Sequence, residues 1–360
     1  MAEGIGGPVG EGRRKVEIRA APRRKALQRR PTMVDVANEA RVSQTTVSLV
    51  LNHADGARLS GETRKRVLLA AARLGYQPVG RGGAPTASSA TALAFVCDEF
   101  STDPWTAIAL DGVRDKAWER GLTVSVAVTR GDANMEAAAL AHLTAGPLVG
   151  LIYATINTRA VDAPAVRPNL PVVLLNCHAA GGAFTSVVPG EVGGGQAATD
   201  VLIAAGHRRI GFINGEASME AARRRLRGYR QALAAAGLPF DGALVREGNW
   251  QPLSGYDATR ELMALDSPPT AIFCGNDLMA VGCYDALREL GLKIPGDVAV
   301  MGYDDREIAQ HLHPPLSTVL LPHFEMGSIA ADLLMDTASG SISHPLQIRV
   351  ECPTVMRNSV

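Results

Sequence analysis

The chain has 360 residues, 46% of them hydrophobic, which is enough to bury the cores of two or three compact domains. No apolar run approaches the roughly 20 residues of a membrane-spanning helix, and the Gly- and Arg-rich start lacks the apolar core of a secretory signal, so we expect a cytoplasmic protein. The formal net charge of zero hides an asymmetry, because residues 1–85 carry 16 Lys and Arg against 7 Asp and Glu, whereas residues 86–360 carry 20 against 29.

The first 30 residues are rich in Gly and then in Arg. They contain too few apolar side chains to form a core, so we expect a disordered basic arm. The arm is either a leader without a role of its own or a source of extra phosphate contacts, and the two interpretations are compatible.

Residues 31–52 read as two short helices joined by a tight turn. Thr32 and Ser43 are positioned as N-caps of the two helices, and Val47 and Val50 give the second helix an apolar face. The opposite face carries a row of mostly short hydrogen-bonding side chains: Gln44, Thr45, Ser48 and Leu49. Such a row on a rigid helix suits the major groove of DNA, although an ordinary helical hairpin would be capped in the same way.

A third helix is expected over residues 60–74, with Ser60 as its cap and Gly75 after its end. The three helices would form one DNA-binding domain over residues 31–76. Residues 77–90 are then rich in Gly, Pro and Ser, which is typical of a hinge linker.

These segments resemble the DNA-binding headpiece of the LacI/GalR family of bacterial transcription regulators. The shared motifs, in chain order between residues 34 and 78, are V-D-V-A, A-x-V-S-x-x-T-V-S, V-L-N, S-x-x-T-R-x-x-V and L-G-Y-x-P. The resemblance implies a homodimer that binds double-stranded operator DNA as a pseudo-palindrome. It also implies that the DNA contacts come from one set of side chains: Thr32, Ser43, Gln44, Thr45, Thr46, Ser48, Leu49 and Asn52.

Two positions depart from the family pattern. Leu49 stands where many members carry Arg, so it would touch a thymine methyl group instead of forming a bidentate contact to guanine. Residues 79–85 contain three glycines, and Pro85 falls where relatives have a Leu that wedges into the minor groove, so a stable hinge helix is not expected. We expect a straighter operator complex, with Arg81 entering the minor groove in place of the wedge.

From residue 91 to residue 360, short apolar segments alternate with amphipathic ones, which predicts parallel βαβ units in two doubly wound halves. Four motifs resemble the effector domain of the same family, which is similar to periplasmic sugar-binding proteins: G-H-R-R-I-x-F-I-x-G, R-x-x-G-Y, P-x-A-I-F-C-G-N-D and D-V-A-V-M-G-Y-D-D. The resemblance implies two lobes linked by three chain crossings, near Val187, Thr318 and Leu346, with a ligand between them. The expected fold is therefore an all-α helix-turn-helix headpiece followed by a two-lobed α/β effector domain.

Polar residues of this second part follow the predicted strands, at the edge where open α/β sheets bind ligands. Five of them, by the resemblance, are candidates to bind a small sugar-like effector: Asp103, Arg225, Trp250, Asn276 and Asp304. A guanidinium, an amide and a carboxylate can share the donors and acceptors of vicinal hydroxyls, and an indole can cover the apolar side of a sugar ring. Each residue also has a structural interpretation, because Arg225 lies in an arginine run, Asn276 is placed to cap a helix, and Trp250 would fit a core.

Other chemistry is not expected. The glycine run at 193–195 lacks the spacing and the Lys-Ser/Thr of a phosphate loop, and no nucleophile, base and orienting residue form a catalytic set, so we expect neither an enzyme nor a cofactor. The five cysteines are scattered and the H-x-H at 311–313 stands alone, so core thiols and no metal site are expected. The leading hypothesis is an effector-controlled transcription regulator, most simply a repressor. The alternative is a sugar-binding protein of the same fold that has lost specific DNA binding.

Overall fold

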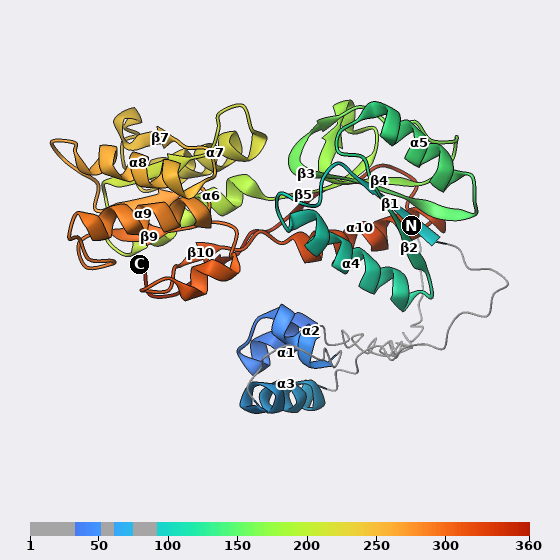
Figure 1. Cartoon of the computed structure of the whole chain (residues 1–360), viewed down its shortest axis with the longest axis horizontal. Coiled ribbons are helices and arrows are strands. Elements are labelled where there is room, and N and C mark those ends of the chain that lie inside the picture. The colour runs from blue at the N-terminus through green and yellow to red at the C-terminus, as the bar shows by residue number, and fades with distance from the viewer. Residues whose placement is uncertain (1–32, 52–60, 75–91) are drawn as a thin grey trace, which may run out of the picture. The chain divides into compact units, whose positions relative to one another are not determined.

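The computed structural model describes residues 33–51, 61–74 and 92–360 (Figure 1). The expected arm and linker lie outside these ranges, as do Thr32, Asn52 and Arg81. The chain divides into two compact units, and the boundary between them follows Gly82. The first unit contains three short helices, and the second contains every strand of the described chain.

Three helices form the first unit: α1 Met33–Ala40, α2 Gln44–Leu51 and α3 Gly61–Leu74. Arg41 has a left-handed backbone, with φ of 53°, in the turn between α1 and α2. Ser43 caps α2, because its Oγ accepts a 3.1 Å hydrogen bond from the backbone N–H of Thr46. Apolar side chains of the three helices meet in one small core: Val36, Ala37, Ala40, Val47, Val50, Val67, Ala70 and Ala71. This is the helix-turn-helix unit that the sequence predicts.

The second unit begins with lobe 1, a six-stranded parallel sheet in the order β11-β5-β4-β3-β1-β2. Its strands are β1 Ala92–Cys97, β2 Thr123–Val128, β3 Leu148–Val161, β4 Val172–Ala179, β5 Thr185–Pro189 and β11 Gln347–Val350. Helices α4 Trp105–Glu119 and α10 His323–Ala338 pack on one face, where Leu93 and Phe95 are buried. Helix α5 Ala133–Thr144 packs on the other face, over Ala94 and Val96. The sheet is therefore covered on both sides.

Lobe 2 repeats this plan with a four-stranded parallel sheet in the order β7-β6-β8-β9. Its strands are β6 Ile210–Asn214, β7 Val245–Glu247, β8 Ala271–Cys274 and β9 Ala299–Met301. Helices α6 Glu191–Ala204 and α7 Glu220–Ala235 pack on one face. Helices α8 Pro252–Met263 and α9 Asp277–Glu289 pack on the other.

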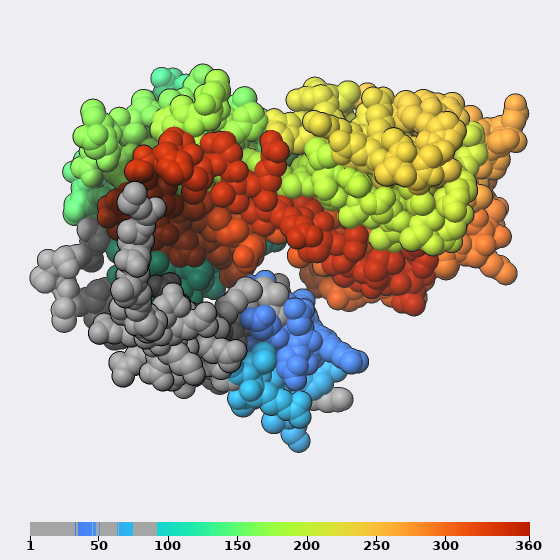
Figure 2. Space-filling model, turned by 180° about the vertical axis from the view of Figure 1, so that it is seen from behind, coloured from blue at the N-terminus to red at the C-terminus, as the bar shows by residue number. Residues whose placement is uncertain are grey.

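The chain passes between the two lobes at three places in the described structure. It leaves lobe 1 after β5, returns between β10 Thr318–Val319 and α10, and leaves again between β11 and β12 Thr354–Val355. Strands β10 and β12 pair antiparallel, so two of the connections run side by side. The red C-terminal segments extend over both lobes in Figures 1 and 2. The predicted fold class, two doubly wound lobes, is confirmed. The last of the three connections follows β11 rather than lying near Leu346, because residues 347–350 still pair with β5 in lobe 1.

Three elements of the second unit have irregular ends. Helix α8 begins directly at Pro252, since proline is well suited to the first turn of a helix. Residues 242–247 form a 3-10 turn, Gly242–Leu244, and then a strand of only three residues. Strand β3 extends to Val161, with a shift of register against β4 after Ala154.

The cysteines and the helix lengths can be compared with what the composition suggests. All five cysteines are free and buried, where they act as small apolar side chains. Of the helices that the structure describes, none combines the length and the apolar character needed to cross a membrane.

Candidate effector site and operator-binding helix

Four of the five predicted effector residues come together on lobe 2; we call Arg225, Trp250, Asn276 and Asp304 the effector cluster. Arg225 lies on α7, whereas the other three lie in loops at the carboxyl ends of β7, β8 and β9. The arginine guanidinium is 5.5 Å from the centre of the Trp250 ring, and its Nη1 is 3.7 Å from Asp304 Oδ1. The fifth residue, Asp103, precedes α4 in lobe 1.

Close packing of α6 on α7 places Arg225. A Cβ atom at Gly228 of α7 would lie 2.2 Å from the Val192 carbonyl oxygen, and one at Gly195 of α6 would lie 2.5 Å from the Arg225 carbonyl oxygen. Only glycine allows the two helices this approach. Within the glycine run at 193–195, Gly195 thus serves the packing of α6 on α7, and Glu191, the first residue of α6, is brought against Arg225.

The glycines of this run are expected to differ in their response to alanine. Gly195→Ala should lower the free energy of unfolding by about 1 to 3 kcal/mol, because the methyl group meets backbone atoms of α7. Gly193→Ala is the matched control, since nothing lies within 4 Å of its added Cβ, and it should raise stability by about 0.5 to 1 kcal/mol. Urea unfolding of both variants checks the pair; equal effects would contradict this account of the packing.

Arg225 forms a buried ion pair with Glu191. Its Nε and Nη2 donate hydrogen bonds of 2.8 and 3.0 Å to the two carboxylate oxygens, and Nη1 donates to the Gly275 carbonyl oxygen. The guanidinium also lies 3.7 Å from the centre of the Tyr303 ring. Burial opposes the positive charge, but Glu191, Tyr303 and Asp304 more than offset it, so the pKa of Arg225 lies above its usual value. The arginine is held charged and in one orientation.

Asp304 is a buried carboxyl group beside this pair, with 5% of its surface exposed. Burial raises its pKa to about 7, although Arg225 and Arg306 act in the opposite direction. Its backbone φ of 110° is unusual for a residue with a side chain. The backbone N–H of Asp304 donates to the Val319 carbonyl oxygen, which ties the residue to one of the connections between the lobes.

Asn276 has the capping role that the sequence also allows. Its Oδ1 accepts a 2.8 Å hydrogen bond from the backbone N–H of Met279 in the first turn of α9, and its Nδ2 donates at 3.0 Å to the Trp250 carbonyl oxygen. Trp250 has a φ of 67°, and its Nε1 donates to the Met219 sulfur at 2.9 Å. Asn276 therefore orients the Trp250 loop against the start of α9.

Asp103 is hydrogen-bonded to Arg306, a residue that the sequence analysis did not identify as part of the site. Its Oδ1 accepts a 2.5 Å hydrogen bond from Arg306, which follows β9 in lobe 2. The Arg306 guanidinium also lies 4.7 Å from the centre of the Trp105 ring, and Trp105 stacks on His323 at 5.0 Å. A second bond between the lobes joins His178 Nε2 to Glu220 at 2.9 Å. These contacts hold lobe 1 and lobe 2 together on the side of the effector cluster.

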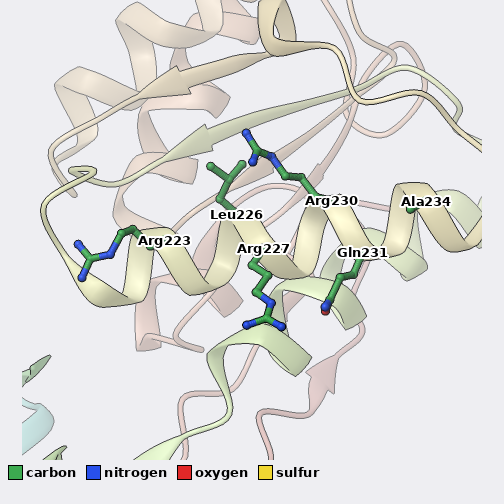
Figure 3. A pocket seen from close by; sticks show the side chains of 6 residues that line it. All are labelled: Arg223, Leu226, Arg227, Arg230, Gln231 and Ala234. Atoms are coloured by element: carbon green, nitrogen blue, oxygen red, sulfur yellow. The ribbon is translucent and has the colours of Figure 1, made fainter. Parts of the chain in front are cut away.

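Three members of the effector cluster are buried in this conformation, with Arg225 and Asn276 each 3% exposed and Asp304 5% exposed, whereas Trp250 is partly exposed. A surface hollow of about 590 Å³ lies on the outer face of α7 (Figure 3). Its lining comes from that one helix: Arg223, Leu226, Arg227, Arg230, Gln231 and Ala234.

The DNA-binding candidates lie on or next to α2, where the structure describes them. Ser43 is exposed at the N-cap, and its Oγ also contacts the Thr46 hydroxyl at 2.8 Å. Gln44 is the first residue of the helix and is partly exposed. Thr45, Ser48 and Leu49 belong to α2, but their side chains are outside the described part of the chain.

Comparison with known proteins agrees with both units. Residues 32–79 match the family described as "Bacterial regulatory proteins, lacI family", and residues 199–360 match a periplasmic binding protein-like domain. The ribose operon repressor of Haemophilus influenzae is 32% identical over 339 residues, which cover 91% of this chain and 98% of that protein.

Two solved structures extend the likeness to nearly the full length. A transcriptional regulator CelR–cellobiose complex has a TM-score of 0.64 at 33% identity, covering 92% of this chain and 100% of that one. A lac repressor dimer bound to operator and the anti-inducer ONPF also has a TM-score of 0.64, at 28% identity, covering 92% and 99%. The chain therefore belongs to the lacI family of bacterial regulatory proteins and is a DNA-binding transcription regulator controlled by a small-molecule effector.

Proposed function

We propose that the protein is a homodimeric repressor whose affinity for its operator changes when a sugar or sugar derivative binds between the lobes. The proposal that the effector is a sugar rests on the effector cluster, in which the Arg225 guanidinium has a carboxyl group at 3.7 Å and an indole ring at 5.5 Å. This set suits a ring that has hydroxyls at its edge and C–H groups on its face. Relatives named for ribose and cellobiose support the choice of ligand class.

An unpaired acceptor beside the cluster favours a ligand with hydroxyl donors. Asn214 ends β6 and donates through Nδ2 to the Ala222 carbonyl oxygen at 3.1 Å. Its Oδ1 is buried and has no hydrogen-bond partner among the described residues. Because an unpaired buried acceptor is costly, a ligand hydroxyl at this position would gain a strong contact. We propose Asn214 as an additional effector residue.

Ligand entry requires the lobes to part, since the cluster is buried. The bonds of Arg306 to Asp103 and of His178 to Glu220 would break on opening and re-form around a bound ligand. Such a change would move lobe 1, which follows the headpiece in the chain, relative to lobe 2, and we propose that this movement couples effector binding to operator affinity. Asp103 is then a residue of the closing contact as well as a candidate ligand residue. We propose no catalytic role for any of these groups.

Operator recognition is proposed for the exposed face of α2. Gln44 and Thr45 would reach base edges, while Ser43, Thr46 and Ser48 would lie near phosphates. Thr32, Asn52 and Arg81, which the structure does not describe, stay candidates for further contacts. A regulator that binds operator DNA acts where that DNA is, so we propose a cytoplasmic location.

The half-site preference is expected to change when Leu49 is replaced by Arg, because a bidentate contact to guanine replaces contact with a thymine methyl group. Selection from a random duplex library with wild type and Leu49→Arg measures this. An unchanged preferred sequence would contradict the proposed position of Leu49. Fluorescence anisotropy on the selected duplex also tests the alternative function, since a sugar-binding protein without specific DNA binding would show no preference over a scrambled duplex.

A second copy of the chain would cover the free edge of lobe 1. Strand β2 is an edge strand, and Val126 on it is 43% exposed. Trp118 of α4 and Met135 of α5 are also exposed, at 38% and 49%. An apolar, unpaired edge strand favours association. We expect Val126→Lys to shift the protein from dimer to monomer in sedimentation equilibrium, whereas Glu119→Lys should leave the dimer intact.

A further inference from the structure

The arginine that is typical of effector binding already has an ionic partner inside this protein. Arg225 Nε and Nη2 donate to the Glu191 carboxylate at 2.8 and 3.0 Å. The two side chains are 4% and 2% exposed. Two parallel charge-assisted bonds in a buried site are the strong form of this contact. An anionic ligand would have to compete with Glu191 for the same donors.

Glu191 also occupies the position that would otherwise attract an anion. It is the first residue of α6, a helix of 14 residues that begins just beyond the carboxyl end of β5. The positive end of a helix dipole next to a guanidinium is a common place for a phosphate or carboxylate to bind. In this chain a carboxylate of the protein fills that place.

The other charged groups near Arg225 add no further free cation among the described residues. Arg306 is bound to Asp103 and lies 3.4 Å from Asp304. His323 has its pKa lowered to about 3 by burial and by Arg225, so it is neutral at physiological pH. Two guanidinium groups therefore face three carboxyl groups, those of Glu191, Asp103 and Asp304. A ligand that brought its own negative charge would be poorly accommodated here.

We propose that Glu191 is a specificity-determining residue, because its carboxylate balances the positive charge of Arg225. It restricts the effector to an uncharged polyhydroxy compound and excludes phosphorylated and carboxylate-bearing sugars. This inference rests on the proposed effector function of the same site. Neutral hydroxyls can share the remaining N–H groups of Arg225 and the free lone pairs of Glu191 without separating the pair.

The test removes the Glu191 carboxylate and offers inorganic phosphate to the exposed guanidinium. Thermal unfolding of the full chain is followed at increasing phosphate, with ionic strength held constant by NaCl, for wild type, Glu191→Ala and the double variant Glu191→Ala/Arg225→Met. We expect Glu191→Ala to gain a saturable rise in Tm, with apparent phosphate affinity at least about tenfold tighter than that of wild type.

The double variant separates this site from phosphate bound elsewhere, such as at the basic headpiece, because it keeps every other basic group. A gain in Glu191→Ala that disappears in the double variant supports the proposal. No gain, or an equal gain in both variants, overturns it. If Glu191→Ala does not fold, Glu191→Gln takes its place, since it keeps the size of the side chain and removes the charge.

Calorimetry on wild type with matched pairs, ribose and ribose 5-phosphate or glucose and glucose 6-phosphate, provides a second measurement. Tighter binding of a phosphorylated member would overturn the role of Glu191 and leave effector control intact. Binding of the neutral member alone supports the proposal. Binding of no sugar at all would count against the proposed ligand class, while the phosphate titration would still decide the role of Glu191.

Discussion

Arg225→Ala is expected to lower the free energy of unfolding by about 3 to 5 kcal/mol, because it leaves Glu191 as an unpaired buried carboxylate. The loss should appear as a lower midpoint in urea with an unchanged slope. Effector affinity should fall as well, since ligand hydroxyls lose a charged donor, at about 1.5 to 3 kcal/mol for such a bond.

Two further variants distinguish the ion pair from general damage to α7. Arg225→Met/Glu191→Leu removes both charges and keeps apolar volume, so it should recover most of the lost stability without recovering effector binding. Arg227→Ala changes an exposed arginine two residues along the same helix and should alter stability by less than about 0.5 kcal/mol. If the double variant is no more stable than Arg225→Ala, then the unpaired Glu191 carboxylate is not what destabilises Arg225→Ala.

The order of elements could be predicted because it depends on local patterns. The strands of both sheets are short apolar runs with helices between them, and glycines such as Gly206, Gly237 and Gly291, which have positive φ, mark the ends of helices α6, α7 and α9. The positions that follow the strands could also be predicted, since Asn276 and Asp304 lie within recognisable motifs. These features require no knowledge of which elements pack together.

The pairings within the site could not be predicted in the same way. Glu191 and Arg225 are 34 residues apart and meet only because Gly195 and Gly228 let α6 and α7 approach. The glycine run can be read from the sequence, but its role in packing depends on α7, which the sequence does not place against it. Asp103 and Arg306 are 203 residues apart and belong to different lobes, so no spacing in the sequence relates them. The sequence did not indicate which donors and acceptors of the predicted effector residues are already bonded to other groups of the protein.

Asp304→Asn is expected to make the protein more stable at neutral and alkaline pH and to have little effect near pH 4. Burial raises the pKa of Asp304 from 3.8 to about 7, so between these values the folded protein binds a proton that the unfolded chain releases. The stability that this group contributes is complete below about pH 4 and is lost as pH rises through about 7. A shift of about three pKa units corresponds to about 4 kcal/mol.

Urea unfolding of wild type and Asp304→Asn at a series of pH values from about 4 to about 8 measures this difference. Burial also raises the pKa of Asp277, which hydrogen-bonds Thr318 at 2.6 Å, so wild type should keep a slope of the same sign from that group and the comparison must use the difference between the two proteins. Asp285→Asn, an exposed aspartate on α9, is the control and should show a small difference at every pH. A stability gain in Asp304→Asn that is the same at pH 4 and pH 8 would show that the carboxyl group does not titrate in this range. A gain that grows with pH would identify Asp304 as a proton-binding group within the effector site, so that ligands donating a hydrogen bond to its carboxylate bind more tightly above about pH 7.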